Sequence, residues 1–405
     1  MSQRDSSLWS AIEDVVVNDN CSGCGLCATL SDGIEMQLSE EGYLRPTPAA
    51  NYPADERDGA LQVFKRACPG RIVVAPKPEA GSKVHPIFGR HLGVWEGWST
   101  DHEIRNAGSS GGILTTIAAY LSEKDGAAAQ VVRMDGDRPT RSVPVRIMTR
   151  EEALLSAGSR YAPVAVAAEH LQGTGSVTGK PCEISAIRAA ADAATAGPVL
   201  LSFFCAGTPS QQATEKLITQ LGHNVDTVTA MRYRGDGWPG NFVVTSEDGS
   251  SAHMGYEKSW GAVLGKQLQG RCKSCVDGTG EGADIAVGDY WAADENGYPV
   301  FEDQDGRSVV IARTQRGRRI LEECVAAGLI EISPIGLESV SKIQPLQVKR
   351  RMTLPGRLLG KRLTGQRIPD YRGYGLFRGL VRRPVQNLKA AAGTVRRSLR
   401  KHSRS

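Results

Sequence analysis

Three closely spaced cysteines near the N-terminus are the residues best suited to redox chemistry. Cys21, Cys24 and Cys27 are separated by two residues each, and glycines stand between them. Because glycine lets the backbone turn sharply, one short loop can direct three thiolates to an iron–sulfur cubane. The next cysteine, Cys68, is followed at once by proline, as is the last ligand of bacterial-type iron–sulfur runs. These four residues predict a [4Fe–4S] cluster, with a four-cysteine zinc site or an accidental grouping as alternatives.

A second set of four cysteines is spread along the rest of the chain. Cys182 follows a proline just before a predicted helix, Cys205 ends a predicted buried strand, and Cys272 and Cys275 form a Cys-x-x-Cys pair. Two single thiols and a pair complete a four-thiolate set, so these residues predict a second [4Fe–4S] cluster. The alternatives are a redox-active pair, a zinc knuckle, or buried thiols that act as small apolar side chains. Cys324 falls in an amphipathic helical pattern and is expected in the core.

The composition favours a soluble protein in a reducing compartment. Of the 405 residues, 40% are hydrophobic and 23% are charged, which is ordinary for a globular protein. No run of about 18 apolar residues occurs, and the polar start lacks the apolar centre of a signal peptide. We therefore expect a cytoplasmic protein, where cysteines serve as metal ligands or redox thiols rather than as disulfides.

The charge of +5 is distributed unevenly along the sequence. Residues 349–405 carry a net charge of +16, whereas the rest of the chain carries −11. Beyond about residue 345 no globular pattern is visible, although Leu376, Phe377, Leu380 and Val381 suit one face of an amphipathic helix. Such a basic tail predicts that the protein contacts an anionic membrane surface, as a peripheral protein at the inner face of the membrane. An acidic partner and a disordered, soluble tail are the alternatives, and no nucleic-acid partner is expected.

Strands alternate with helices from about residue 93 to residue 327, which predicts a mixed α/β (α+β) fold with sites at strand ends. Strands are expected at 93–98, 127–134, 199–204, 284–289 and 308–313, and helices at 113–121, 184–194, 210–221 and 317–327. The segment 74–83 is rich in proline and charge and reads as a linker. The expected divisions are a ferredoxin-like iron–sulfur segment (1–84), the two parts of an α/β flavin-binding domain (85–225 and 226–345) and the basic tail (346–405).

A turn of small residues, 106–112, precedes the helix predicted at 113–121. Ser109 or Ser110 is a candidate N-cap, and the free N–H groups at the helix start suit a phosphate. Arg105 and Lys180 offer positive charge for a pyrophosphate, although basic side chains beside turns are often simply solvated. Small residues there also serve merely to pack a helix against a sheet. A flavin would fit the iron–sulfur prediction, because it couples one-electron carriers to two-electron substrates.

Seven motifs, in order, resemble the coenzyme F420 hydrogenase/dehydrogenase beta-subunit family, which includes 7-hydroxymethyl chlorophyll a reductase-like proteins. They are Cys21-x-x-Cys24-x-x-Cys27, Arg105-Asn-Ala-Gly-Ser109-Ser-Gly-Gly112, Gly158-Ser-Arg-Tyr161, Gly179-Lys-Pro-Cys182-Glu, Cys205-Ala-Gly-Thr-Pro-Ser210, Cys272-Lys-Ser-Cys275 and Ala283-Asp-Ile-Ala-Val-Gly-Asp289-Tyr-Trp. The resemblance runs from about residue 15 to residue 335, so the basic tail lies outside it.

The resemblance implies an oxidoreductase with FAD and two [4Fe–4S] clusters. It implies electron transfer between a ferredoxin-like donor or partner redox subunit and a small organic two-electron acceptor such as coenzyme F420. The alternatives are an electron-transfer subunit without its own substrate, linked to surface-polysaccharide synthesis, and a zinc-stabilised scaffold. No catalytic residue is assigned. The residues it implies at the cofactor are Arg105, Asn106, Ser109, Ser110, Gly111, Gly112, Tyr161 and Lys180.

Overall fold

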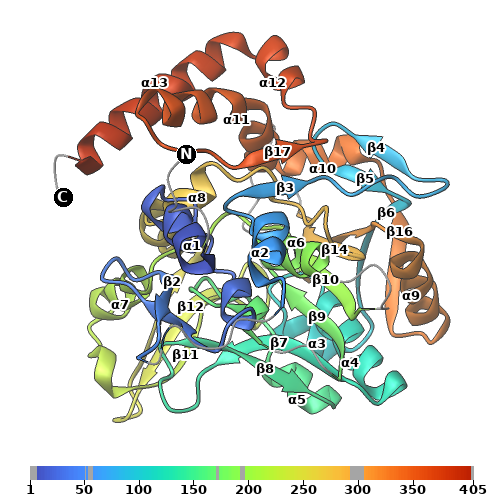
Figure 1. Ribbon diagram of the computed structural model, residues 1–405. Helices are drawn as coiled ribbons and strands as arrows, with labels where there is room; N and C mark the ends of the chain where they lie inside the picture. The colour runs from blue at the N-terminus through green and yellow to red at the C-terminus, as the bar shows by residue number, and fades with distance from the viewer. Residues whose placement is uncertain are drawn as a thin grey trace.

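An eight-stranded mixed sheet forms the centre of the protein, as the computed structural model shows (Figure 1). The structure describes residues 7–50, 52, 58–169, 173–191, 197–291 and 305–402. The four central strands, β7, β9, β10 and β14, are parallel, and the outer ones are antiparallel to their neighbours. This arrangement confirms the predicted mixed α/β class. In spatial order the strands are β16 (Ile330–Pro334), β6 (Gly93–Ser99), β15 (Ser308–Ala312), β14 (Ile285–Asp289), β10 (Val199–Phe203), β9 (Thr174–Gly179), β7 (Ala128–Met134) and β8 (Ser142–Ile147).

Helices cover both faces of this sheet, and the central strand β10 shows why. Successive side chains of a strand point to opposite faces, so Val199 and Leu201 join one core cluster while Leu200 joins another. The first cluster includes side chains of α4 (Ile113–Asp125) and α9 (Gln315–Ala326), and the second includes side chains of α6 (Pro181–Ala190). Cys324 is fully buried in the first cluster, as expected. The short helices α3 (His102–Ala107) and α5 (Arg150–Leu155) lie beside α4.

The strands that follow residue 225 belong partly to the large sheet and partly to a smaller one. The strands β11 (Val228–Arg232), β12 (Asn241–Ser246) and β13 (Ser251–Gly255) form a three-stranded antiparallel sheet. It packs against α7 (Gln211–Gln220) and the π-helical turn η5 (Glu257–Val263) around the buried Phe242 and Leu217. Because β14, β15 and β16 pair within the large sheet, residues 85–225 and 226–345 share that sheet. The proposed division at residue 225 stays a prediction.

The N-terminal segment wraps its cysteine loop with short elements. These are α1 (Leu8–Val17), η2 (Leu26–Thr29), the hairpin β1 (Ile34–Leu38) and β2 (Leu44–Pro48), α2 (Ala60–Ala67) and β3 (Ile72–Val74). The apolar side chains of α1 that recur at helical spacing, Leu8, Ile12 and Val15, pack with Phe64 of α2 beside the cysteines. A second hairpin, β4 (Lys83–His85) and β5 (Gly89–His91), leads to the large sheet.

The expectation of a C-terminal tail without a globular pattern is wrong for the residues that the structure describes. The 19-residue helix α11 (Pro345–Leu363) buries Arg350 and Arg351 against the body of the protein, and β17 (Asp370–Arg372) extends β3. Helices α10 (Leu337–Ile343), α12 (Phe377–Arg382) and α13 (Pro384–His402) complete this region, drawn in orange and red in Figure 1. Sequence periodicity missed the packing because the buried arginines look like surface charge. Within the described ranges, no helix is both long enough and apolar enough to cross a bilayer.

Candidate cofactor-binding site

A cavity of about 770 Å³ opens at the carboxyl ends of the parallel strands β9, β10 and β14. Its position agrees with the expectation that sites in an α/β sheet lie at strand ends, and its volume is typical of a cofactor site. The first residues of α4 and a segment that leads into α11 also line it. The residues used below are Ser109, Ser110, Gly112, Arg160, Tyr161, Thr178, Lys180, Glu183, Phe203, Cys205, Arg234, Tyr256, Trp260, Asp289 and Trp291.

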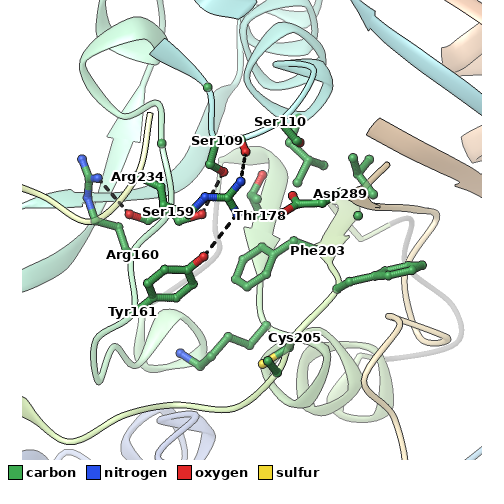
Figure 2. Close-up of a pocket in the computed structure, with 18 of the residues that line it drawn as sticks. Ser109, Ser110, Ser159, Arg160, Tyr161, Thr178, Phe203, Cys205, Arg234 and Asp289 are labelled. Carbon is green, nitrogen blue, oxygen red and sulfur yellow. Dashed lines mark hydrogen bonds and ion pairs between the residues drawn. The ribbon is translucent and has the colours of Figure 1, made fainter. Parts of the chain in front are cut away.

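Arg234 lies in the middle of this wall, between groups from three parts of the chain (Figure 2). Its Nη1 donates to the Asp289 carboxylate at 2.6 Å, and its Nη2 donates to the carbonyl of Ser109. Its guanidinium also stacks over the Tyr256 ring, with 4.7 Å between Cζ and the ring centroid. Burial lowers the pKa of Arg234, but Asp289, Tyr161 and Tyr256 together raise it above its ordinary value. Arg234 therefore stays charged and holds the serine-rich turn (residues 106–112) against the end of β14.

The serine-rich turn faces the cavity but does not cap α4 with a side chain. The N-cap is Gly112, at φ +76°, where no side-chain oxygen accepts a helix N–H. The prediction of Ser109 or Ser110 as N-cap is therefore wrong. The Ser159 hydroxyl instead donates to Ser109 Oγ at 2.8 Å, and Ser110 Oγ lies 2.9 Å from Ser308 Oγ.

The other residues of the turn differ in where they lie. Gly111 donates to Ser308 Oγ at 2.9 Å, and a Cβ there would meet the Gly97 carbonyl at 2.5 Å, so the turn packs directly on the sheet. Arg105 donates to the Gly306 carbonyl and stacks over Trp98, while the Asn106 carbonyl accepts from Gly237 N–H. Neither Arg105 nor Asn106 is among the residues that line the cavity.

Lys180 lines the cavity, but its charge is already paired. Its Nζ donates to Glu183 Oε1 at 2.7 Å and to the Val164 carbonyl at 2.9 Å, and both Lys180 and Glu183 are buried. Burial acts to lower the pKa of Lys180, and the carboxylate of Glu183 reverses this, so that the pKa is raised. The pair therefore presents little net charge to a ligand.

The cavity suits a planar polar ring. Tyr161 and Trp260 lie 4.7 Å apart between ring centroids, and Phe203 points into the same space (Figure 2). Three buried polar atoms of the lining have no hydrogen-bond partner within the described part of the chain: Thr178 Oγ1, Arg160 Nε and Trp291 Nε1. Because unpaired buried polar atoms are costly, these atoms are available to pair with a group bound in the cavity. The donor set fits the polar edge and apolar face of an isoalloxazine.

The four N-terminal cysteines line one small cavity. Gly25, at φ +92°, lets the loop turn, and a Cβ there would meet Ala168 at 2.6 Å. Burial raises the pKa of Cys24 to about 11, and it raises the pKa of Cys68 with help from the charges of neighbouring thiolates. Buried thiols that repel one another as thiolates fit a cationic cluster, which binds them with release of their protons.

The members of the second set of cysteines influence one another electrostatically. Burial raises the pKa of Cys205, and Cys272 and Cys275 raise it further, while Arg350 opposes them. Burial raises the pKa of Cys182 too, with contributions from the charges of Cys205 and Cys24. Cys205 lines the large cavity as well. Cys205 is thus linked electrostatically to the three other thiols of its set, and it also lines the cavity.

A single zinc ion and an iron–sulfur cubane require different distances between the sulfur atoms of their cysteine ligands. Sulfurs around one zinc ion lie about 3.8 Å apart if Zn–S is about 2.3 Å and tetrahedral, whereas the thiolates of a cubane bind separate iron atoms. Within the described residues, no three His, Cys, Asp or Glu side chains are arranged around one ion position.

Arg271, next to Cys272 in α8 (Gly270–Lys273), connects the two cysteine sets electrostatically. Only 2% of it is exposed, and its Nη2 donates to the carbonyl of Pro69, next to Cys68, at 2.9 Å. Its Nε and Nη1 have no partner within the described residues. Burial lowers the pKa of Arg271, but Tyr371, Cys275 and Cys182 together raise it above its ordinary value. Burial raises the pKa of Cys21, and the positive charge of Arg271 opposes that rise. Two unpaired N–H donors among eight cysteines are a further sign of bound acceptors.

Comparison with known proteins assigns more than half of the chain to a family. Residues 94–171 match the profile of the coenzyme F420 hydrogenase/dehydrogenase beta subunit N-terminal region, and residues 175–337 match the profile of its C-terminal region. The chain belongs to this family. The match covers the large sheet and the second cysteine set, which confirms the resemblance seen in the motifs and places the chain among oxidoreductases.

Individual relatives agree with the family assignment. The chain is 26% identical over 285 residues to the coenzyme F420 hydrogenase subunit beta of Methanosarcina barkeri, covering 65% of this chain and 91% of that protein. It is 28% identical over 271 residues to the corresponding subunit of Methanothermobacter thermautotrophicus, covering 62% and 86%. A chain in the F420-reducing [NiFe] hydrogenase complex from Methanosarcina barkeri superposes with a TM-score of 0.53 at 25% identity, covering 72% of this chain and 98% of that one.

Several residues of the site were missed by sequence reasoning. Arg234, Tyr256 and Trp260 line the cavity, yet none lies in a recognised motif. Glu183 ends the motif that begins at Gly179, but the sequence assigned it no role. The only local signal for Arg234 is its place between a strand and a Gly-Asp-Gly turn.

Proposed function

We propose that this chain is an iron–sulfur flavoprotein oxidoreductase that moves electrons between a one-electron donor and a two-electron acceptor. The donor is a ferredoxin-like protein or a partner redox subunit, and the acceptor is coenzyme F420 or another small organic molecule. The proposed cofactors are FAD and two [4Fe–4S] clusters, held by Cys21, Cys24, Cys27 and Cys68 and by Cys182, Cys205, Cys272 and Cys275.

The observation that supports this most is the position of Cys205. It belongs to the second cysteine set through its interaction with Cys272, and it lines the 770 Å³ cavity. The charge of Cys24, in the first set, contributes to the raised pKa of Cys182, in the second set. These charge effects link the second cysteine set to the first, and Cys205 links it to the cavity, which supports an electron path within one chain.

The chain's own residues have positioning roles in this proposal. When bound, FAD supplies the exchange between one-electron and two-electron transfer. Arg234 and Asp289 fix the serine-rich turn, Tyr161 and Trp260 provide an aromatic wall, and the Lys180–Glu183 pair keeps the adjacent wall close to neutral.

Anaerobic purification followed by iron, sulfide and flavin quantification tests the proposal. We expect about eight iron atoms per chain and a visible absorbance that dithionite bleaches. The Cys205→Ser variant should lose about half of the iron, whereas Cys324→Ala, which changes a core thiol, should keep it. A colourless anaerobic preparation containing only zinc would refute the assignment.

An electron-transfer subunit without its own substrate is the second candidate. It is favoured by one observation: the solved relative belongs to a hydrogenase complex. If the purified chain accepts electrons from a dye but reduces coenzyme F420 only after a second protein is added, this candidate is correct. Reduction by the chain alone would exclude it.

We further propose that the C-terminal helices contact an anionic surface at the inner face of the membrane. Phe377 is 74% exposed, and Val381, Val385 and Leu388 are exposed beside the basic residues of α12 and α13. Since α11 is packed into the body, point variants are better probes than a truncation. Phe377→Ser combined with Leu388→Ser should abolish co-sedimentation with vesicles of anionic lipid. Equal pelleting of variant and wild type would exclude this contact.

A further inference from the structure

A second cavity, of about 300 Å³, lies away from the cofactor site and shares none of its lining residues. It is formed by the loop that follows β4, by α10 and α11, and by the segment from Tyr374 to Arg383 that contains α12. Its volume is at the lower end of the range for small-molecule sites. We call it the arginine pocket, defined by His85, Arg351, Arg378, Arg382 and Arg383 together with the apolar residues Ile87, Val348, Met352 and Leu376.

Three arginines reach this pocket from α12 and the residue that follows it. Arg378 and Arg382 are four residues apart and therefore lie on the same helix face. Arg383 adds a third guanidinium, which donates to Gln386 at 3.2 Å and has no second acceptor among the described residues. An adjacent face of α12 carries Phe377 and Val381, which are exposed. Helix α12 thus separates a basic side, toward the pocket, from an apolar side.

The pocket also contains a buried arginine whose charge is paired with Glu281, so the net positive charge of the pocket comes from Arg378, Arg382 and Arg383. Arg351 is 7% exposed, its Nη1 donates to the Val276 carbonyl at 2.6 Å, and its Nη2 donates to Glu281 Oε1 at 2.8 Å. Its Nε is buried and has no acceptor within the described residues. The Tyr374 ring lies 4.6 Å from its guanidinium carbon, which holds the side chain in place.

His85 contributes a donor of known tautomer. Its Nδ1 accepts the backbone N–H groups of Ile87 and Phe88 at 3.2 and 3.3 Å. The ring hydrogen of the neutral form is therefore on Nε2, which makes Nε2 a donor. Burial lowers the pKa of His85, so the neutral form prevails near pH 7. Within the described residues, no carboxylate lines the pocket.

We propose that the arginine pocket binds a phosphate ester. Several guanidinium groups converging on one cavity without a lining carboxylate form a site for an anion, and their planar forks match the paired oxygens of a phosphate. The apolar residues Ile87, Val348 and Leu376 leave room beside the anion for an organic group. The phosphate ester is either a free metabolite or the headgroup of an anionic phospholipid, since both present the same group. The site contains no cysteine, so it stands independently of the cofactor assignment.

Titration calorimetry of the full chain with soluble phosphate esters tests this proposal. The probes are inorganic phosphate, glycerol 3-phosphate and a short-chain, soluble phosphatidylglycerol, at constant ionic strength. We expect a Kd below about 1 mM for at least one ester. Arg378→Gln with Arg382→Gln should weaken it at least tenfold. The matched control, Lys389→Gln with Arg396→Gln, removes the same charge from exposed positions of α13 outside the pocket and should change the Kd less than twofold.

The two sources of the phosphate give different results. Tighter binding of phosphatidylglycerol than of glycerol 3-phosphate identifies a lipid headgroup, and equal or weaker binding identifies a free ester. The proposal is overturned if no ester binds, or if both double variants weaken binding equally, because the attraction would then come from the general charge of the C-terminal region. Circular dichroism of the variants, together with unchanged iron content, verifies that folding and the cofactor sites are intact.

Discussion

The guanidinium of Arg234 and the carboxylate of Asp289 lie 2.6 Å apart, and only 3% of the arginine side chain is exposed. This contact joins the turn after β11 to the end of β14, and Arg234 reaches from there to the serine-rich turn. Three segments distant in sequence are thus held around one charged group at the edge of the cavity.

Removing this arginine should therefore destabilise both fold and site. Arg234→Gln leaves Asp289 without its partner, and we expect the free energy of unfolding to fall by about 3–5 kcal/mol, as for other broken buried ion pairs. Flavin content should fall with it. Arg318→Gln, which breaks the exposed pair with Glu322 on α9, should cost less than about 1 kcal/mol. Urea denaturation measures both; equal costs would show that the Arg234 contact has no special role.

The acid sensitivity of the protein should depend on Asp284. Burial raises its pKa, but Arg188 and Arg316 lower it more, so that its pKa in the folded protein is below the ordinary value. The ionised form therefore stabilises the fold above about pH 4, and this contribution is lost as the pH falls through the folded pKa. Asp284→Asn should flatten the fall in unfolding free energy between about pH 5 and 2. Asp137→Asn, at an exposed turn, should leave that slope unchanged.

The charge of Arg271 should favour reduction of the proposed clusters. A buried positive charge stabilises the added electron, so Arg271→Gln should lower the reduction potential. We expect about a tenfold change in the reduction equilibrium, which for one electron is 59 mV. Lys273→Gln, two residues away and exposed, should produce a much smaller change because solvent screens its charge. Spectroelectrochemical titration measures this shift, provided that iron content is equal; identical potentials would contradict the role.

The C-terminal helices should depend on a close contact between α11 and α13. A Cβ at Gly356 would lie 2.0 Å from the carbonyl oxygen of Asn387, whereas a Cβ at Gly393 would meet only the flexible end of Arg397 at 3.4 Å. Gly356→Ala should cost about 1–3 kcal/mol and expose α13 to proteolysis. Gly393→Ala should be neutral or stabilise by up to about 1 kcal/mol. If both variants resist protease equally, α13 is not held by this contact.

The ion pair between Lys180 and Glu183, which keeps one wall of the cavity close to neutral, should make a measurable contribution to the free energy of unfolding. Glu183→Gln removes the partner of the buried Lys180 charge. We expect a loss of about 3–5 kcal/mol in unfolding free energy. Restoring neutrality with Lys180→Met in the same chain should recover part of that loss. Failure of the second change to recover any stability would show that the pair is not held by its charges.

The local sequence determined the strands and helices of the large sheet, because apolar periodicity and turn residues act over a few neighbours. Strands β6, β7, β10, β14 and β15 lie within two residues of their predicted bounds. The cysteine motifs also predicted which thiols belong together, since ligand spacing within a loop is a local property. The association of Cys182 and Cys205 with the Cys272 pair stays a hypothesis, which the effect of Cys272 and Cys275 on the pKa of Cys205 supports.

Only the tertiary structure decided how the charged residues are used. Arg234, Arg350 and Arg351 look like surface charge in the sequence, yet each is buried against carbonyl or carboxylate oxygens far away in the chain. A buried arginine is stable only where those distant acceptors meet it, and no local pattern encodes that meeting. The same reason explains why the basic C-terminal region was taken for a tail, although α11 completes the cavity wall.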